Sequence, residues 1–314
     1  MELKSTSLGK HLAQHPYNRV RLLNAGVEVS GDKHQYLIPF NQLLSIDCKR
    51  GLVWGELEFE LPAGKVVRLH GTEWQETQAF YRHLLKSWLD WSEEMSLISA
   101  EVLQRQTDTI HTLTQQDKWF SRLALTTLQN AIRDSLGALP LPVSRLETFD
   151  NCRDNYWHCL RWLEQGDEMR TAVNQAWMDR TLAAEQPFFE TVESSPLNVS
   201  QSKAVINGEE GVLVLAGAGS GKTSVLVARA AWLMHRQEAT PDQILLLAFG
   251  RKAAEEMNDR IRERLHTDEI QAKTFHALAL HIIQQASRKA PMISQLESDA
   301  KQRRELLIFH WQQQ

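Results

Sequence analysis

The stretch Val212-Leu-Val-Leu-Ala-Gly-Ala-Gly-Ser-Gly-Lys-Thr223 places an apolar run before a glycine-rich turn and a Lys-Thr pair. The apolar residues 212–215 predict a buried parallel strand, and residues 224–235 are compatible with a helix. A strand, a glycine loop and a helix in this order are typical of a phosphate-binding loop, because glycines let backbone N–H groups turn toward phosphate oxygens. The positive end of the following helix attracts phosphate to the same place. An α/β fold with a parallel sheet is therefore expected around this loop.

Two side chains at the end of the loop carry the expected chemistry. Lys222 can reach the β and γ phosphates of a nucleotide, and the Thr223 hydroxyl can bind Mg²⁺, the expected metal ion. Ala216 stands where the pattern G-x-x-x-x-G-K-[ST] begins with glycine. A chance glycine-rich turn before a helix is the alternative, and the order of strand and helix disfavours it. The residues predicted to surround the phosphates are Ala216, Gly217, Ala218, Gly219, Ser220, Gly221, Lys222, Thr223 and Ser224.

Length and composition bound the class of protein. The 314 residues predict two or three domains, and 42% hydrophobic with 24% charged residues is ordinary for a soluble globular chain. The formal net charge of -4 excludes a global basic field, so any nucleic acid would have to bind local patches. Three cysteines without metal-type spacing indicate a reduced compartment and no zinc. Since neither an apolar signal core nor a membrane-spanning run is found, a cytoplasmic protein with no membrane contact is expected.

Residues 1–92 are expected to form a small β-rich domain closed by an amphipathic helix. Six short segments read as strands, and residues 56–61 alternate polar and apolar strictly, which is typical of a half-buried antiparallel strand. Together with the helix they resemble a pleckstrin-homology-like module in shape, and shape does not give function. Aromatic residues on one helix face are interpreted as core, with an exposed docking face as the alternative. The strands are expected at 19–23, 27–29, 35–38, 43–46, 56–61 and 65–70, and the helix face at Trp74, Thr77, Tyr81, Leu84, Trp88 and Trp91.

Residues 93–193 are expected to form an α-helical region, and residues 194–314 a third part that alternates strands and helices. Trp157, Trp162 and Trp177 are expected to pack between the helices, and Cys152 and Cys159 are interpreted as core or surface thiols. Strand 212–215 is expected to pair in parallel with strand 243–249 through a right-handed crossover. The helices are expected at 93–113, 119–138, 145–163, 168–192, 201–207, 224–235, 252–265 and 276–285, with a further strand at 270–275.

Four segments of the third part, taken in order, resemble the superfamily 1 DNA helicases of the UvrD/Rep type. They are similar to the Q motif and to motifs I, Ia and Ib of that family, and residues 1–190 resemble the N-terminal part of helicase IV among its members. The resemblance implies that residues 194–314 are the first RecA-like ATPase domain, a P-loop α/β domain that is truncated here. The segments are Leu197-Asn-Val-Ser-Gln201, Ala216-Gly-Ala-Gly-Ser-Gly-Lys-Thr223, Ala248-Phe-Gly-Arg-Lys-Ala-Ala-Glu-Glu-Met257 and Thr274-Phe-His-Ala-Leu278.

The resemblance assigns ATP and Mg²⁺ as cofactors and gives the loop residues catalytic roles. Gln201 would read the adenine, since an amide both donates and accepts at a base edge; a plain helix-surface glutamine is the alternative. Lys222 would stabilise charge on the phosphates, and Thr223 would hold Mg²⁺. Many relatives carry an arginine that covers the base at the position of Ser224, so this contact is left open.

The resemblance also assigns a track for single-stranded DNA. Phe249 would stack on a base, and Arg251 and Lys252 would contact phosphates. Thr274 and His276 would contact the DNA backbone. The alternatives are a buried Phe249 and a helix-capping or core role for His276.

The function implied is an ATP-dependent DNA helicase that moves 3′ to 5′ on single-stranded DNA, unwinds duplex DNA and serves DNA repair. One alternative is a P-loop ATPase acting as a protein-docking or polymerase-associated switch, with a protein partner bound through residues 1–190. A second alternative, a small-molecule kinase, is disfavoured by motifs Ia and Ib. No Asp-Glu metal motif and no second RecA-like domain is found in the sequence. The chain is therefore expected to be an N-terminal portion of a helicase, with weak nucleotide binding and negligible turnover by itself.

Overall fold

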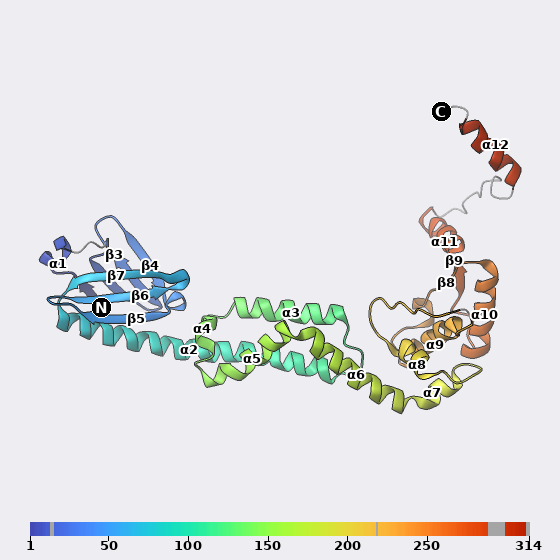
Figure 1. Cartoon of the computed structure of the whole chain (residues 1–314), viewed down its shortest axis with the longest axis horizontal. Helices are drawn as coiled ribbons and strands as arrows, with labels where there is room; N and C mark the ends of the chain where they lie inside the picture. The colour runs from blue at the N-terminus through green and yellow to red at the C-terminus, as the bar shows by residue number, and fades with distance from the viewer. Residues whose placement is uncertain (13–15, 218, 288–298, 312–314) are drawn as a thin grey trace. The chain divides into compact units, whose positions relative to one another are not determined.

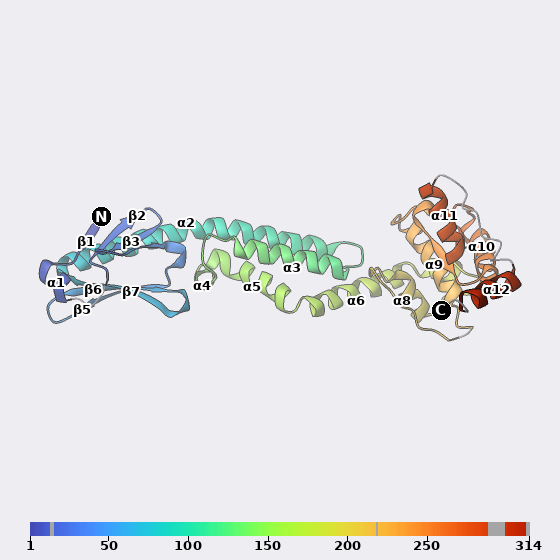
Figure 2. The same cartoon turned by 90° about the horizontal axis from the view of Figure 1, so that it is seen from above.

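The computed structural model describes residues 1–12, 16–217, 219–287 and 299–311. Figures 1 and 2 label the elements along the chain. Two compact units can be separated: Met1–Trp177 with Gly208–Glu210, and Met178–Asn207 with Gly211–Gln314. No helix among the described residues is long and apolar enough to cross a membrane. The division into residues 1–92, 93–193 and 194–314 stays a prediction.

The first unit begins with two antiparallel sheets. One has the order β1-β2-β3-β4, and the other has the order β5-β6-β7. Alternate residues of β6 are buried from one end to the other, as the alternation in the sequence predicted. Five of the six predicted strands are confirmed. The one predicted at 43–46 begins later, as β5 at Ser45, and β1 and the short helix α1 (Ser7–Leu12) were not predicted. The strands are β1 (Glu2–Lys4), β2 (Arg19–Leu23), β3 (Gly26–Ser30), β4 (Gln35–Pro39), β5 (Ser45–Arg50), β6 (Gly55–Leu61) and β7 (Lys65–Thr72).

A single long helix, α2 (Trp74–Gln115), covers the sheets with its first half and continues into the helical region (Figure 2). It spans both of the helices expected at its place. Phe80, Leu84 and Trp88 lie in one core with residues of both sheets. The interpretation of the aromatic face as core is therefore confirmed for the fully buried Leu84 and the nearly buried Trp88.

The second half of α2 packs with α3 (Arg122–Gly137), α4 (Val143–Leu146), α5 (Asp150–Glu164) and the start of α6 (Gly166–Ala184). Cys152 and Cys159 are fully buried there, so both are core thiols. Trp162 and Trp177 are buried as expected, but Trp157 is 49% exposed, so its expected packing is wrong. The reason is helical geometry: Trp157 lies five residues before Trp162, which turns it to a different face of α5.

Two carboxylates bind the amino end of α3. Glu209 accepts a hydrogen bond from the backbone N–H of Arg122 at 2.7 Å, and Glu210 accepts one from the N–H of Leu123 at 3.1 Å. Nη1 of Arg170 lies 2.6 Å from the second carboxylate oxygen of Glu209. The N–H groups at a helix start have no partner within the helix, so these acidic side chains accept their hydrogen bonds. Their negative charge also interacts favourably with the positive end of the helix dipole.

The second unit contains most of the candidate motifs. Its core includes Val227, Leu246, Met257, Ile261 and Ile270. Two short strands, β8 and β9, pair in parallel, with Ala248 opposite Thr274. The elements beyond α6 are α7 (Gln186–Thr191), α8 (Val199–Ile206), α9 (Lys222–His235), the 3₁₀ helix η3 (Pro241–Gln243), β8 (Leu246–Ala248), α10 (Arg251–Leu265), β9 (Ala272–Thr274), α11 (Phe275–Ser287) and α12 (Ala300–Trp311).

The strand predicted at residues 212–215 is wrong for this structure. Within the described residues nothing pairs with this segment, and Leu213 and Leu215 are 82% and 85% exposed. The parallel pair is formed instead by β8 and β9, with α10 between them. An apolar run indicates a preference for burial, but a strand also needs a hydrogen-bonding neighbour that the run itself does not specify. The strands predicted at 243–249 and 270–275 are shortened to β8 and β9, and Gln243 belongs to η3 instead.

Candidate nucleotide and nucleic-acid site

The glycine-rich loop before α9 uses backbone angles that favour glycine. Gly219 has a φ of 74° and Gly221 a φ of 83°, both in the left-handed region. Gly221 is the residue from which α9 starts. The Ser220 hydroxyl donates to the carbonyl oxygen of Gly217 at 2.7 Å, which tightens the turn. Ala218 lies outside the described residues.

Lys222 folds back over the loop. Its Nζ donates to the carbonyl oxygen of Ala216 at 3.0 Å and to that of Gly217 at 2.6 Å. The side chain of the next residue, Thr223, makes no hydrogen bond with the part of the chain that the structure describes. The loop thus brings together a cation and a free hydroxyl at the positive end of α9, which suits a polyphosphate with its metal ion.

Gln201 joins the loop from α8. Asn198 caps this helix by accepting the Gln201 N–H at 3.0 Å, and Oε1 of Gln201 accepts the Asn198 N–H at 2.9 Å. Nε2 of Gln201 donates to the carbonyl oxygen of Ser220 at 3.1 Å. An amide has two lone pairs and two N–H groups, so one of each remains for a ligand. Gln201 therefore lies against the loop, with one N–H and one lone pair of its amide not used in these bonds.

Arg229, which the sequence reasoning missed, fixes α8 against α9. Its Nη1 donates to the carbonyl oxygen of Val205 in the last turn of α8 at 2.5 Å. Burial lowers the pKa of Arg229 below its ordinary value. A charged residue inside the apolar sequence of α9 was the signal that could have identified it, since such a residue needs a buried partner.

The ends of β8 and β9 form the second half of the site. Phe249 follows β8 and is 97% exposed, so its alternative as a buried residue is wrong. Phe275 follows β9 and is 60% exposed. Ala248 and Thr274 are opposite each other in a parallel pair, so Phe249 and Phe275 both follow the carboxyl ends of the two strands. Phe275 was missed, although it is the last residue of the predicted strand 270–275, as Phe249 is of the predicted strand 243–249.

The charged and polar residues expected at this edge lie in the first turns of α10 and α11 and, for Thr274, at the end of β9. Arg251 and Lys252 open α10, and both are exposed. His276 is exposed in the first turn of α11, so its alternative as a core histidine is wrong. The Thr274 hydroxyl oxygen accepts the N–H of Ala277 at 3.2 Å, which leaves its O–H as a donor. Two helix N-termini and three basic side chains therefore follow the same strand edge.

Asn258 of α10 holds β9 in place. Its side chain donates to the carbonyl oxygen of Ala272 at 3.1 Å and accepts the Ala272 N–H at 2.7 Å. These two bonds replace the ladder bonds that another strand would make. The position of Thr274, two residues further on, depends on this contact.

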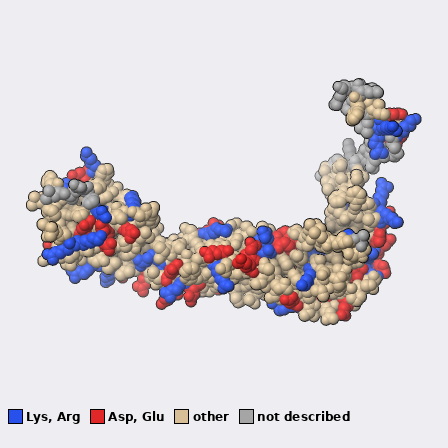
Figure 3. Space-filling model, in the orientation of Figure 1, with Lys and Arg blue, Asp and Glu red and all other residues tan. Residues whose placement is uncertain are grey.

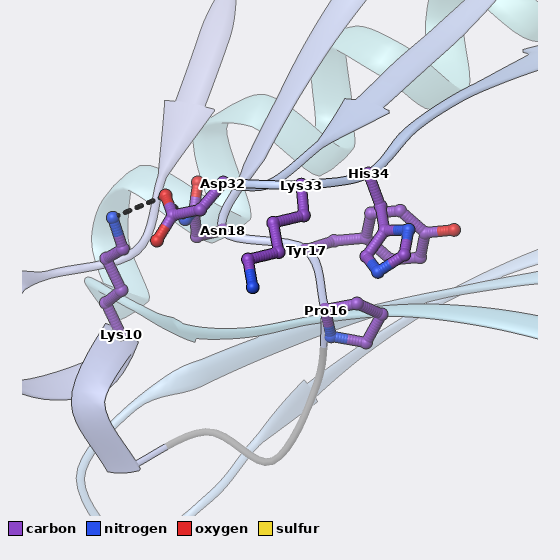
Figure 4. A pocket seen from close by; sticks show the side chains of 7 residues that line it. All are labelled: Lys10, Pro16, Tyr17, Asn18, Asp32, Lys33 and His34. Atoms are coloured by element: carbon purple, nitrogen blue, oxygen red, sulfur yellow. Dashed lines mark hydrogen bonds and ion pairs between the residues drawn. The ribbon is translucent and has the colours of Figure 1, made fainter.

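A hollow of about 330 Å³ in the β-rich region, drawn in Figure 4, is separate from these residues. Lys10 lies 2.7 Å from Asp32 there, and Asn18 donates to the same carboxylate. Hydrogen bonds from Lys10 and Asn18 lower the pKa of Asp32, which is therefore a paired carboxylate. Among the described residues, no group of three or more His, Cys, Asp or Glu could hold a metal ion. On the face in Figure 3, acidic and basic side chains are interspersed over the helices of the first unit.

Comparisons with known proteins match two different families to the N-terminal and C-terminal parts of the chain. The family described as DNA helicase IV / RNA helicase N terminal matches residues 1–164, and the family described as UvrD/REP helicase N-terminal domain matches residues 197–313. DNA helicase IV of Escherichia coli (strain K12) is 63% identical over all 314 residues of this chain, which cover 46% of that protein. DNA helicase II of the same organism is 45% identical over 89 residues, 28% of this chain and 12% of that protein. The PcrA helicase of Staphylococcus aureus (strain Mu50 / ATCC 700699) is 38% identical over 89 residues, with the same shares. The chain thus spans less than half the length of these relatives.

Proposed function

Because the chain belongs to the DNA helicase IV / RNA helicase N-terminal family and carries a UvrD/REP helicase N-terminal domain, we propose that it is the nucleotide- and DNA-binding part of an ATP-dependent DNA helicase. The observation that carries the proposal is that the glycine-rich loop, Gln201 and the exposed Phe249 all belong to the second unit. The loop of Gly219, Gly221 and Lys222 meets Gln201 on one side, and an exposed edge with Phe249 follows in the same unit.

ATP with Mg²⁺ is the proposed ligand of the loop. The residues fit this group, since the glycines at positive φ leave space that side chains would fill and Lys222 already lies over the loop. Thr223 would hold the metal ion, which would neutralise phosphate charge when bound. Lys222 would exchange the carbonyl oxygens of Ala216 and Gly217 for phosphate oxygens, a stronger charge-assisted bond. The amide of Gln201 would read the adenine edge.

A single DNA strand is the proposed ligand of the exposed edge. Phe249 is 97% exposed at a strand end, and stacking on bases would give this ring a partner of any sequence. Arg251 and Lys252 would contact phosphates, as would Thr274 at the end of β9 and His276 at the start of α11. Phe275 would add a second apolar surface beside Phe249.

For the whole protein we propose 3′-to-5′ movement on single-stranded DNA with unwinding of duplex DNA, in the cytoplasm and in the service of DNA repair. The printed names of the relatives, DNA helicase IV and DNA helicase II, support the activity. A protein partner for residues 1–190 stays a prediction, as does the pleckstrin-homology-like shape.

The test uses the full-length protein and two duplexes that differ only in the polarity of a single-stranded tail. Unwinding of the 3′-tailed duplex, with ATP hydrolysis stimulated by oligo(dT), is the expected result, and Phe249→Ala should weaken both. A 5′ preference would overturn the direction alone. Hydrolysis that responds to a bound protein and not to DNA would replace the helicase with the docking switch.

A further inference from the structure

The guanidinium of Arg260 reaches from α10 to the first turn of α9. Its Nη1 donates to Oγ of Ser224 at 3.0 Å. The nearest carboxylate oxygen, Oε1 of Glu256, lies 3.9 Å from Nη2, and the Glu256 side chain is 67% exposed. An ion pair this long and this exposed contributes little. The positive charge of Arg260 is therefore brought to the residue that follows Lys222 and Thr223 without being closely neutralised.

Ser224 lies on the side of the loop that carries Gln201. A Cβ built on Gly221 would lie 2.7 Å from Nε2 of Gln201 and 3.9 Å from Cβ of Ser224. The Gln201 amide and the Cβ of Ser224 are thus no further apart than the sum of these two distances, with Gly221 between them. Lys222, by contrast, turns toward the carbonyl oxygens of Ala216 and Gly217. Arg260 arrives beside the group that would recognise the base and not beside the group that would bind the terminal phosphates.

We propose that Arg260 is a specificity-determining residue of the nucleotide site, whose guanidinium contacts the base end of the bound nucleoside triphosphate beside Gln201. The assignment rests on the nucleotide site proposed above. With Nη1 donating to Ser224, the guanidinium is held at one nitrogen, and its remaining N–H donors and its flat face can meet a ribose oxygen or a base. The short side chain of Ser224 leaves room for this approach, and it anchors the arginine instead of contacting the base itself.

The assignment has a consequence for α10. The same helix carries Arg251 and Lys252 at its start and Arg260 nine residues later, a rise of about 13 Å along the axis. One rigid element would therefore touch the nucleotide at one point and the DNA strand at another.

The experiment compares ATP with inorganic tripolyphosphate, which keeps the phosphates and lacks the base and ribose. Affinities are measured by calorimetry on the full-length protein and its Arg260→Ala, Arg260→Lys, Ser224→Ala and Lys222→Ala variants. The matched control is Arg262→Ala, because Arg262 lies on the same helix and pairs with Asp259 and Asp268. Thermal unfolding without nucleotide is recorded for every variant.

Arg260→Ala is expected to weaken ATP binding by about tenfold and to leave tripolyphosphate binding within about twofold. Arg260→Lys should behave similarly, since an ammonium lacks the flat face, and it decides the matter if the alanine variant unfolds. Ser224→Ala should weaken ATP binding by a smaller factor than Arg260→Ala. Arg262→Ala should leave the affinities for both ligands unchanged.

Unchanged ATP affinity in both Arg260 variants would overturn the assignment, and so would an equal loss of ATP and tripolyphosphate, which indicates a merely structural contact between α9 and α10. Lys222→Ala should lose both ligands. If it keeps both, the proposed nucleotide site fails, and that outcome is distinguishable from a failure of Arg260 alone.

Discussion

Nζ of Lys222 lies 2.6 Å from the carbonyl oxygen of Gly217, so the loop's own backbone holds the lysine where a phosphate would bind. A phosphate oxygen can replace this neutral acceptor by a charged one, and charge-assisted bonds are about twice as strong. At the proposed nucleotide site the ammonium would therefore exchange its carbonyl acceptors for phosphate oxygens.

Removing this ammonium should lower nucleotide affinity sharply. For Lys222→Ala in the full-length protein we expect about a hundredfold weaker ATP binding, equal to about 3 kcal/mol, and loss of hydrolysis. Fluorescence titration with a labelled ATP measures it. Lys203→Ala is the control, since Lys203 is exposed on α8, and it should bind as the parent does. Unaltered affinity in Lys222→Ala would show that the loop does not bind phosphate.

The exposed ring of Phe249 gives a prediction that separates binding from stability. Because the ring is 97% exposed, Phe249→Ala should leave the free energy of unfolding unchanged within about 0.5 kcal/mol. Affinity for oligo(dT) should fall by about 1–3 kcal/mol, the usual value for one stacked base. Trp157→Ala, which removes a half-exposed aromatic side chain from α5, should leave DNA affinity intact. Loss of stability without loss of DNA affinity would mean that the ring packs instead of stacking.

Some of this arrangement could be predicted from sequence because the signal is local. The alternation of β6 sets one face toward the core, and the capping of α8 by Asn198 depends on residues three apart. The carboxyl-end position of Phe249 follows in the same way from the apolar run before it.

Other features could not be predicted, because they depend on partners far away in the chain. The apolar residues 212–215 do not say which segment pairs with them, and in this structure nothing described does. Arg229 and Arg260 reach carbonyl or hydroxyl oxygens on other helices, a relation that spacing along the chain does not contain. Trp157 is exposed because it lies on a different face of α5 from Trp162, and the prediction that both pack between helices did not consider this difference.

The basic residues at the start of α10 predict a salt dependence. Each phosphate contact to a single strand adds about 0.7 to the slope of log affinity against log salt concentration. Replacing both Arg251 and Lys252 by alanine should therefore reduce that slope by about 1.4. Fluorescence anisotropy with oligo(dT) at several salt concentrations measures it. Arg264→Ala, at the far end of the same helix, should keep the parent slope; an equal slope in the double variant would place the phosphates elsewhere.

Glu209 predicts a pH dependence in the stability of the first unit. Burial opposes its ionisation, but hydrogen bonds from the Arg122 N–H, from Arg170 and from the Trp119 indole N–H outweigh burial and lower its pKa from 4.5 to about 2. A carboxyl with a depressed pKa contributes stability above its unfolded pKa, and that stability is lost as the pH falls through the folded pKa. The contribution should therefore be complete above pH 4.5 and disappear toward pH 2.

Glu209→Gln tests this directly. At pH 7 the variant should lose about 2 kcal/mol of unfolding free energy, since it removes the carboxylate 2.6 Å from the Arg170 guanidinium, which is only 12% exposed and whose other carboxylate, Asp167, is 3.9 Å away. The difference from the parent should shrink as the pH falls from 4.5 to 2, because the parent then loses the same charge. Urea unfolding followed by circular dichroism at several pH values measures it. Glu101→Gln, which breaks an exposed pair with Arg105, should cost less than about 0.5 kcal/mol. A deficit that stays constant with pH would show that the ionisation of Glu209 does not stabilise the fold.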